Sequence, residues 1–297
     1  MLLDLPPPII QSLNLECLRS SFVSIDIKRD DLIDPVVSGN KLFKLTEHLS
    51  EFKNQNAKTL ITFGGAYSNH LHATAYVGKQ LDIKTVGFIR AEAHELENLT
   101  PTLQDCKKWG MQLEPVSRSE YKLKQTSDYI LAVSKKYERP YWVPEGGSGQ
   151  LGVKGAERIL EGVDQSQYDV IVAACGTGTT LSGIINASEP HIRVMGVPVL
   201  KGASWMFDEV ASQLTQHNQN WDLALDYHFG GYGKWSRELT DFVSAIYAEA
   251  KLPLDLIYTG KAFYALIDLI KRGEIKQGGR VLFIHTGGLQ GNRSTSL

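Results

Sequence analysis

The chain has 297 residues, enough for one large or two medium domains. Hydrophobic residues make up 42% and charged residues 22%, a composition that excludes a collagen, a coiled coil and an intrinsically disordered chain. Lys and Arg total 31 against 33 Asp and Glu, a net charge of −2, so we expect neither nucleic acid nor an anionic membrane as a partner.

Two further features bear on location and redox chemistry. No apolar run approaches the roughly 20 residues that span a bilayer, and residues 1–8 lack the pattern of an export signal. The three cysteines, Cys17, Cys106 and Cys175, are scattered and form no CxxC pair. We therefore expect no disulfide framework, no bound metal and a location in the cytoplasm.

Short apolar runs alternate along the chain with longer amphipathic stretches. The runs predicted as strands span residues 59–63, 85–90, 141–144, 170–174, 194–199 and 281–285. The stretches predicted as helices span residues 69–81, 119–136, 150–161, 180–187, 203–214, 237–251 and 261–272. This alternation predicts an α/β fold in which helices flank mainly parallel sheets.

Glycine clusters follow four of the predicted strands directly. They lie at residues 64–65, 144–149, 175–183 and 285–288. Ligands of α/β proteins bind at the carboxyl ends of parallel strands, so we expect the functional site to be built from these four loops.

The loop at residues 175–181 reads CGTGTTL. Small residues between a strand and a helix expose backbone N–H groups that can bind an anion. The loop has Leu181 where a dinucleotide-binding loop has its third glycine, and it lacks the Gly-Lys-Ser/Thr of a Walker loop. Two interpretations stay open, a cup for one phosphate monoester and a tight turn without a ligand.

Lys41 and Lys44 are three residues apart in the segment 38–45, SGNKLFKL. On a helical turn this spacing puts both amino groups on one face, and a solvated helix start accounts for it. Alternatively, a lysine that follows Gly-Asn at an element boundary is desolvated, with a lowered pKa that suits it to form a Schiff base with an aldehyde.

Five motifs together carry a family resemblance. They are residues 39–41 with Lys44, residues 64–65 with 68–70, residues 177–180, residues 258–261 and residues 285–288. In this order they resemble the 1-aminocyclopropane-1-carboxylate (ACC) deaminase and D-cysteine desulfhydrase family. That family belongs to the tryptophan-synthase-β-like enzymes, the fold type II enzymes that use pyridoxal 5'-phosphate (PLP). The resemblance implies PLP as cofactor and a lyase or deaminase activity on a small amino acid.

The resemblance also implies roles for individual residues of the cofactor site. Lys41 matches the family lysine that forms the Schiff base with PLP, and Lys44 matches a lysine near the phosphate. Asn69 matches the asparagine that hydrogen-bonds the phenolic oxygen of PLP. The residues that match the phosphate loop are Thr177, Gly178, Thr179 and Thr180.

The substrate site implied by the resemblance includes Ser68, Asn69 and His70, at the start of a predicted helix where a carboxylate could dock. The catalytic set is Lys41 and Ser68 together with Tyr232 and Tyr258, which match two active-site tyrosines. Lys41, once displaced by substrate, is the expected base for the Cα proton. Packing alone also accounts for the two tyrosines, and His285 is either a site residue or a hydrogen-bonded core histidine.

Thr259 and Thr286 discriminate the branches of the family, since the deaminases carry Glu and Leu at these positions. A carboxylate beside the pyridine nitrogen would keep it protonated, whereas a hydroxyl can donate to a neutral ring. We therefore expect both threonines at the cofactor and an α,β-elimination of the D-cysteine type, giving pyruvate, ammonia and sulfide. ACC deamination to 2-oxobutanoate and ammonia, or PLP binding without turnover, are the alternatives.

The expected organisation is two α/β domains. Residues 1–45 and 151–297 form the larger, PLP-binding domain, and residues 46–150 form the smaller one. We expect PLP in the cleft between the two domains. The resemblance alone implies a homodimer.

Overall fold

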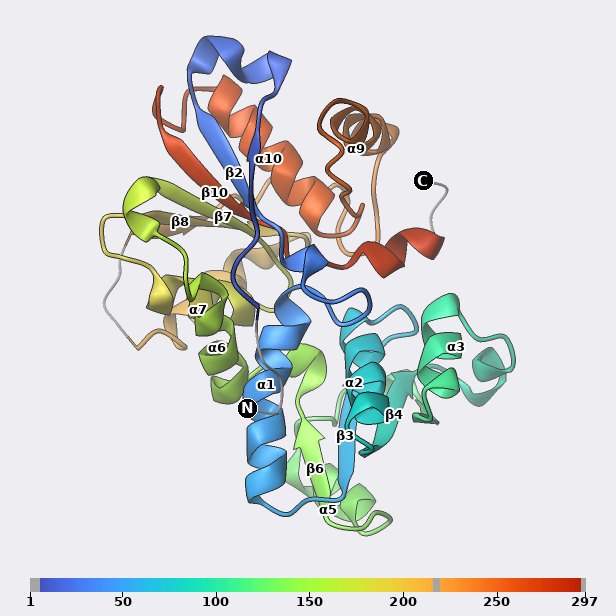
Figure 1. Cartoon of the computed structure of the whole chain (residues 1–297). Coiled ribbons are helices and arrows are strands. Elements are labelled where there is room, and N and C mark those ends of the chain that lie inside the picture. Colours follow the sequence, from blue (N-terminus) through green and yellow to red (C-terminus); the bar gives the residue numbers. More distant parts are fainter. Residues whose placement is uncertain (1–5, 216–219, 295–297) are drawn as a thin grey trace. The chain divides into compact units, whose positions relative to one another are not determined.

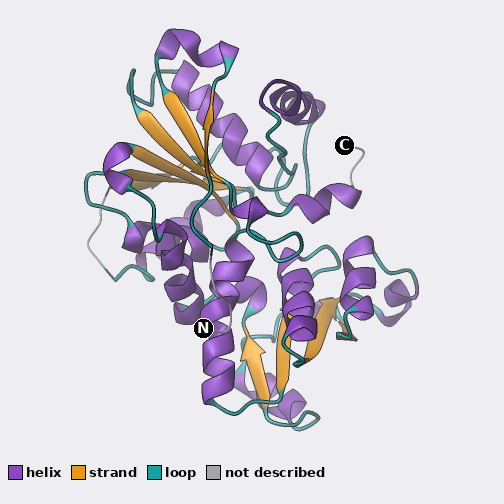
Figure 2. Ribbon diagram, viewed as in Figure 1, coloured by secondary structure: helices purple, strands orange, loops and turns teal. Residues whose placement is uncertain are grey.

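The computed structural model describes residues 6–215 and 220–294 (Figures 1 and 2). The described chain forms two compact units, a smaller one of residues 41–152 and a larger one of residues 6–40 and 153–294. The chain passes between the units after Asn40 and after Gly152. The expected division into domains of residues 46–150 and of residues 1–45 with 151–297 stays a prediction.

The larger unit contains a six-stranded sheet with the strand order β1-β2-β10-β7-β8-β9. Its strands are β1 (Ile10–Leu13), β2 (Ser24–Lys28), β7 (Val170–Cys175), β8 (Arg193–Pro198), β9 (Trp221–Leu223) and β10 (Arg280–Ile284). All neighbouring strands are parallel except β1 and β2, which are antiparallel. The central strands are buried on both faces, which explains the continuous apolar sequence of β7.

Helices cover both faces of this sheet (Figure 2). They are α6 (Gln150–Glu157), α7 (Thr179–Ala187), α8 (Met206–Ala211), α9 (Arg237–Ala250) and α10 (Thr259–Lys271). Met195 and Val197 of β8 share a core with residues of α9 and α10. Gly196, between them, faces Leu181 of α7. Side chains alternate across a strand, so α7 lies on the opposite face from α10.

The smaller unit contains a four-stranded parallel sheet with the strand order β5-β4-β3-β6. Its strands are β3 (Thr59–Gly64), β4 (Lys84–Arg90), β5 (Gln112–Val116) and β6 (Pro140–Val143). Its helices are α1 (Asn40–Asn54), α2 (Asn69–Gln80), α3 (Pro101–Lys108), α4 (Arg118–Tyr121) and α5 (Ser127–Ser134). Ile89 packs with α2 and α3, whereas Phe88 packs with aromatic residues of α4 and α5.

The expected α/β class with mainly parallel sheets is confirmed, and every predicted strand is present. The single helix predicted at residues 119–136 is wrong. Thr126 is extended (φ −82°, ψ 132°) and separates α4 from α5. The break lets Tyr121 of α4 and Tyr129 of α5 both pack on Phe63, with ring centroids 5.8 and 6.5 Å away. Tertiary packing here overrides a continuous helical pattern.

No helix within the described ranges combines the length and the apolar character that crossing a bilayer requires.

The contact between α6 and α7 generates a test of the fold. A Cβ atom at Gly183 would lie 2.5 Å from the Cβ of Ala156 and 2.6 Å from the carbonyl oxygen of Val153. Alanine gains about 1 kcal/mol of helix propensity over glycine, but overpacking costs about 1–3 kcal/mol. We expect Gly183→Ala to lower the free energy of unfolding, measured in urea.

The matched control is Ser244→Ala on the exposed face of α9, which should change the stability by less than about 0.5 kcal/mol. A Gly183→Ala protein more stable than the parent would contradict the close approach of α6 and α7.

Candidate active site

The four glycine-containing loops follow the carboxyl ends of strands, two in each unit. In the larger unit β7 and β10 are parallel neighbours, so the loops after Cys175 and Ile284 lie side by side. In the smaller unit β3 and β6 are parallel neighbours, so the loops after Gly64 and Val143 share an edge. The prediction that these loops lie at carboxyl ends of strands is confirmed.

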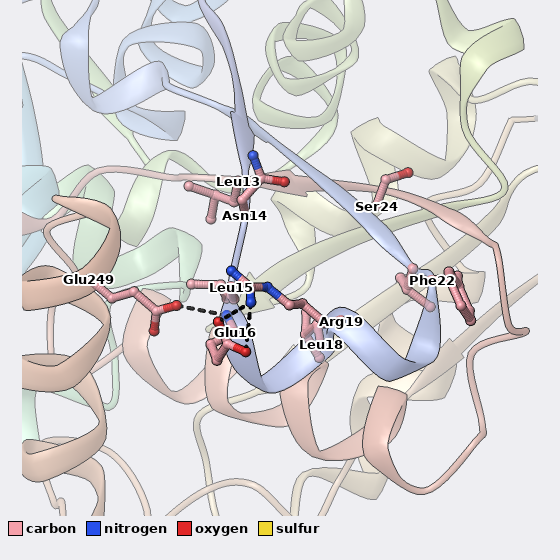
Figure 3. Close-up of a pocket in the computed structure, with 10 residues that line it drawn as sticks. Leu13, Asn14, Leu15, Glu16, Leu18, Arg19, Phe22, Ser24 and Glu249 are labelled. Carbon is pink, nitrogen blue, oxygen red and sulfur yellow. Dashed lines mark hydrogen bonds and ion pairs between the residues drawn. The ribbon is translucent and has the colours of Figure 1, made fainter.

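A pocket of about 430 Å³ lies elsewhere in the larger unit (Figure 3). Ser24 lines this pocket and pairs with Arg280 at the amino end of β10. The pocket therefore lies at the amino ends of the strands, whereas the glycine-containing loops lie at their carboxyl ends. Its polar groups bind one another. The Glu16 N–H donates to Glu249 at 2.8 Å, and Arg19 forms an ion pair with Glu16 at 2.7 Å. This pocket is therefore not part of the candidate site.

The loop between β7 and α7 fits a phosphate group. Gly178 precedes α7 with φ 82°, a conformation that favours glycine. The first N–H groups of α7 have no acceptor within the helix, and the helix dipole favours an anion there. Thr179 and Thr180 are buried in the first turn. The Thr180 hydroxyl accepts a hydrogen bond from Asn40 Nδ2 at 2.8 Å, which leaves its proton available to a ligand.

The turn before Lys41 is pinned to two loops of the larger unit. Gly39 has φ 67°, and a Cβ there would lie 2.0 Å from the Thr286 carbonyl oxygen. The Asn40 N–H donates to that same oxygen at 3.3 Å, while the Asn40 side chain reaches Thr180. Asn40 therefore joins the loop between β7 and α7 to the loop after β10, one peptide bond before Lys41. The sequence analysis gave Asn40 no role.

A buried carboxylate, Asp255, organises the start of α10. It accepts hydrogen bonds from the N–H groups of Ile257, Tyr258 and Thr259 at 2.8, 2.7 and 2.9 Å. The Thr259 hydroxyl donates to Asp255 at 2.6 Å and accepts from the Asp255 N–H at 2.9 Å. The one proton of Thr259 is thus already committed to Asp255. Sequence analysis missed Asp255, whose spacing before a helix start was the available signal.

The hydroxyl proton of Thr286, unlike that of Thr259, is not committed to a partner among the described residues. Thr286 is buried, and among residues 6–215 and 220–294 its hydroxyl makes no hydrogen bond. Of the two hydroxyls expected beside a ring nitrogen, the geometry therefore favours Thr286 as the donor. The place of Thr259 at the cofactor stays a prediction.

Tyr232 and Tyr258 lie together in the larger unit. Their rings meet edge to face with centroids 6.1 Å apart. A Cβ at Gly176 would lie 3.4 Å from the Tyr258 ring, so Tyr258 also covers the start of the phosphate loop. The two tyrosines and this loop therefore form one cluster.

His285 is a hydrogen-bonded core histidine, the simpler of its two interpretations. Its side chain is fully buried, and Nε2 lies 2.7 Å from the Pro253 carbonyl oxygen, which can only accept. Nδ1 accepts from the Gly287 N–H at 3.3 Å. Nδ1 also lies 3.4 Å from Asp31 Oδ1, so both ring nitrogens have partners in the core.

In the smaller unit, basic side chains gather at the carboxyl edge of the sheet. A Cβ at Gly147 would lie 3.4 Å from Lys44 and 3.5 Å from His70, so both line the loop after β6. The Thr62 hydroxyl donates to the Val143 carbonyl at 2.8 Å and therefore accepts from His70 Nε2 at 2.9 Å. Nδ1 of His70 then carries a lone pair, buried and without a partner among the described residues.

Burial and mutual repulsion lower the pKa values of these basic groups. Burial lowers the pKa of Lys41 to about 8 and that of His48 to about 4. The pKa of Lys44 falls well below its usual value because of burial and the nearby Lys41. Burial, followed by the charges of Lys41, Lys44 and His48, does the same to His70. Such a cluster fits an anionic ligand, and an amine with a lowered pKa suits an aldehyde.

Helix α2 begins beside this cluster. Ser68 is its N-cap and accepts a hydrogen bond from the Leu71 N–H at 3.2 Å, while Asn69 is the first residue of the helix. The Ser68 hydroxyl keeps its proton for another acceptor. α1 begins at Asn40, so Lys41 and Lys44 do lie at the start of a helix. Lys44 is buried, however, so the interpretation that both lysines are solvated is wrong for Lys44.

The smaller unit thus holds an amine of low pKa, which suits an aldehyde, and the larger unit holds backbone and hydroxyl groups at the start of α7, which suit a phosphate. The sequence model of the family described as "Pyridoxal-phosphate dependent enzyme" matches residues 3–287. The chain belongs to this family. The expected cofactor and the expected tryptophan-synthase-β-like fold are therefore confirmed.

Named relatives of this PLP-dependent enzyme match nearly all of it. A Thermotoga maritima protein, provisionally named 1-aminocyclopropane-1-carboxylate deaminase, is 35% identical over 97% of this chain and 96% of its own length. The bifunctional D-cysteine desulfhydrase/1-aminocyclopropane-1-carboxylate deaminase of Arabidopsis thaliana is 32% identical over 98% of this chain and 78% of its own. A crystal structure of an ACC deaminase homologue superposes with a TM-score of 0.83 at 28% identity, covering 96% of this chain and 90% of that chain. The family resemblance is confirmed.

The buried histidines make this PLP-dependent enzyme sensitive to acid. The pKa of His48 is about 4 in the folded chain against 6.5 for the ordinary residue. The unfolded chain therefore binds the proton first, and the free energy of unfolding falls as pH falls from about 6.5 to about 4. At 1.36 kcal/mol per pKa unit, His48 should contribute about 3 kcal/mol to this loss of stability. Urea unfolding of the full chain across this pH range would measure it.

His48→Gln should flatten this pH dependence, whereas His94→Gln, at an exposed histidine of the same unit, should leave it unchanged. An identical slope in the parent and in His48→Gln would show that His48 does not contribute.

Proposed function

We propose that this PLP-dependent enzyme catalyses α,β-elimination from a small amino acid of the D-cysteine type. The observation that carries the proposal is the pair of threonines, Thr259 and Thr286, at the positions where the deaminase branch has Glu and Leu. PLP, when bound, supplies an electron sink that makes the Cα proton of an amino acid removable. A hydroxyl at the ring nitrogen supports elimination of a good leaving group such as thiolate better than opening of a carbon ring.

In this proposal Lys41 binds the cofactor through its amine and later removes the Cα proton. A base works best when its pKa lies near the operating pH, and burial brings the pKa of Lys41 to about 8. Loss of the Cα proton and departure of thiolate from Cβ convert cysteine to 2-aminoacrylate. Addition of water then gives pyruvate and ammonia, so the products are pyruvate, ammonia and sulfide.

The phosphate is held, in this proposal, by the start of α7 and by Lys44. Gly178 admits the anion close to the backbone, and the N–H and hydroxyl groups of Thr179 and Thr180 donate to it. Asn69 faces the phenolic oxygen, as the resemblance implies.

The substrate carboxylate is placed, in this proposal, at the start of α2, where the Ser68 hydroxyl and the N–H groups of the first turn can donate. His70 has a different part in this proposal. Its Nδ1 is an acceptor in the neutral ring, so it suits an amino group better than a carboxylate. We therefore assign the carboxylate to Ser68 and Asn69 and leave His70 to orient an amine.

Deamination of ACC to 2-oxobutanoate and ammonia is the second candidate, because that activity stands in the names of the Thermotoga and Arabidopsis relatives. We further propose a homodimer, on the family resemblance alone, and a cytoplasmic location. Cys17, Cys106 and Cys175 form no disulfide within the part of the chain that the structure describes, which fits a reducing compartment.

The proposal predicts the products. The holoenzyme should release sulfide and pyruvate from D-cysteine and form little 2-oxobutanoate from ACC, each measured colorimetrically. Thr286→Val removes one hydroxyl without changing the side-chain shape and should lower the turnover of D-cysteine about tenfold, the worth of one hydrogen bond.

The control for this test is Thr126→Val, at an exposed threonine of the smaller unit, which should leave turnover unchanged. Faster formation of 2-oxobutanoate from ACC than of pyruvate from D-cysteine would favour the second candidate.

A further inference from the structure

Lys261, in the first turn of α10, is a fully buried lysine that the proposed chemistry does not use. Its Nζ donates to the carbonyl oxygens of His228 and Gly231, each at 2.9 Å. Burial lowers the pKa of Lys261 to about 8, and the nearby Asp255 opposes this shift. Burying an amine lowers the stability of a fold unless the amine is hydrogen-bonded, so the bonds to these two carbonyls offset the cost of burying Lys261.

Both carbonyls belong to one irregular loop, residues 228–233. The backbone has positive φ at Phe229, Gly230, Gly231 and Gly233 (50°, 92°, 115° and 66°), so the loop has no regular structure of its own. The Gly231 N–H donates to the His228 oxygen at 3.0 Å, a bond within the loop. The two hydrogen bonds of Lys261 connect this loop to α10.

The residue that this loop carries is Tyr232, which is half exposed and whose ring meets that of Tyr258. Tyr258 immediately precedes α10, and Asp255 holds its N–H at 2.7 Å. Two residues, Asp255 just before α10 and Lys261 in its first turn, therefore bond to the backbone next to the two tyrosines. Asp255 holds the backbone of Tyr258, and Lys261 holds the backbone that leads into Tyr232, through the carbonyls of His228 and Gly231.

We propose that Lys261 is a positioning residue that holds the loop 228–233 so that Tyr232 stays against Tyr258. This inference rests on the proposed function in one respect, since the two tyrosines belong to the catalytic set of that reaction only through the family resemblance. The geometry of the loop itself does not depend on it.

The test compares the holoenzyme with Lys261→Met, which keeps the length of the side chain and removes its donors. Hydrogen exchange of the amides of residues 228–234, followed by mass spectrometry, should become at least about tenfold faster, the effect of losing hydrogen bonds from a charged donor. The kcat for D-cysteine should fall by a similar factor, while the visible absorbance of bound PLP stays the same. Lys271→Met, at an exposed lysine of the same helix, should change none of these.

A double-mutant cycle separates positioning from general destabilisation. If Lys261 acts through Tyr232, then Lys261→Met should lower kcat/KM no further in a Tyr232→Ala background. Additive losses, or unchanged exchange at residues 228–234, would overturn the proposal.

A second variant keeps the test open if Lys261→Met does not fold. Gly231→Ala strains the loop at φ 115° and leaves the buried lysine in place. It should give the same faster exchange and lower kcat, and unchanged exchange would again overturn the proposal. The exchange measurement needs no substrate, so its outcome is independent of whether D-cysteine is turned over.

Discussion

The turn at Gly39 and Asn40 is the constraint that holds together the two candidate-site loops of the larger unit. Gly39 approaches the Thr286 backbone too closely for any side chain, and Asn40 bonds both that backbone and Thr180. The loops after β7 and β10 are neighbours because their strands are parallel and adjacent. Asn40 fixes them to each other and sets the point from which Lys41 starts. A lysine on a free loop would keep its water and its ordinary pKa, and would be a poorer partner for an aldehyde.

A second constraint is electrostatic. Burial lowers the pKa values of Lys41, Lys44, His48 and His70, and neighbouring basic groups lower those of Lys44, His48 and His70 further. In the larger unit, by contrast, a buried charge has donors around it, because three N–H groups and a hydroxyl donate to the carboxylate of Asp255. The smaller unit thus gathers basic groups whose protonation a bound anion would favour, whereas the larger unit compensates the charge of Asp255 at a helix start. The two arrangements serve binding and positioning respectively.

Sequence patterns predicted the central strands because parallel strands buried on both faces are continuously apolar, as in β3 and β7. They missed β1, β5 and β9, which are short, partly exposed strands at sheet edges. They also missed β2, which lies between β1 and β10. Helix α1 had a usable signal in Leu42, Leu45, Leu49 and Phe52, spaced three or four residues apart. The roles of Asn40 and Lys261 were beyond local patterns, because their partners lie 140 and about 30 residues away in the chain. The family motifs gave the candidate residues, but only the structure shows that the Thr259 proton belongs to Asp255.

The central claim is that Lys41, placed by Asn40 and desolvated, is the residue that binds PLP. The most direct measurement is reduction of the holoenzyme with borohydride, followed by digestion and mass spectrometry of the pyridoxyl-labelled peptide. We expect the label on Lys41, in the peptide that follows Arg29. A label on Lys44 or Lys261 would contradict the account.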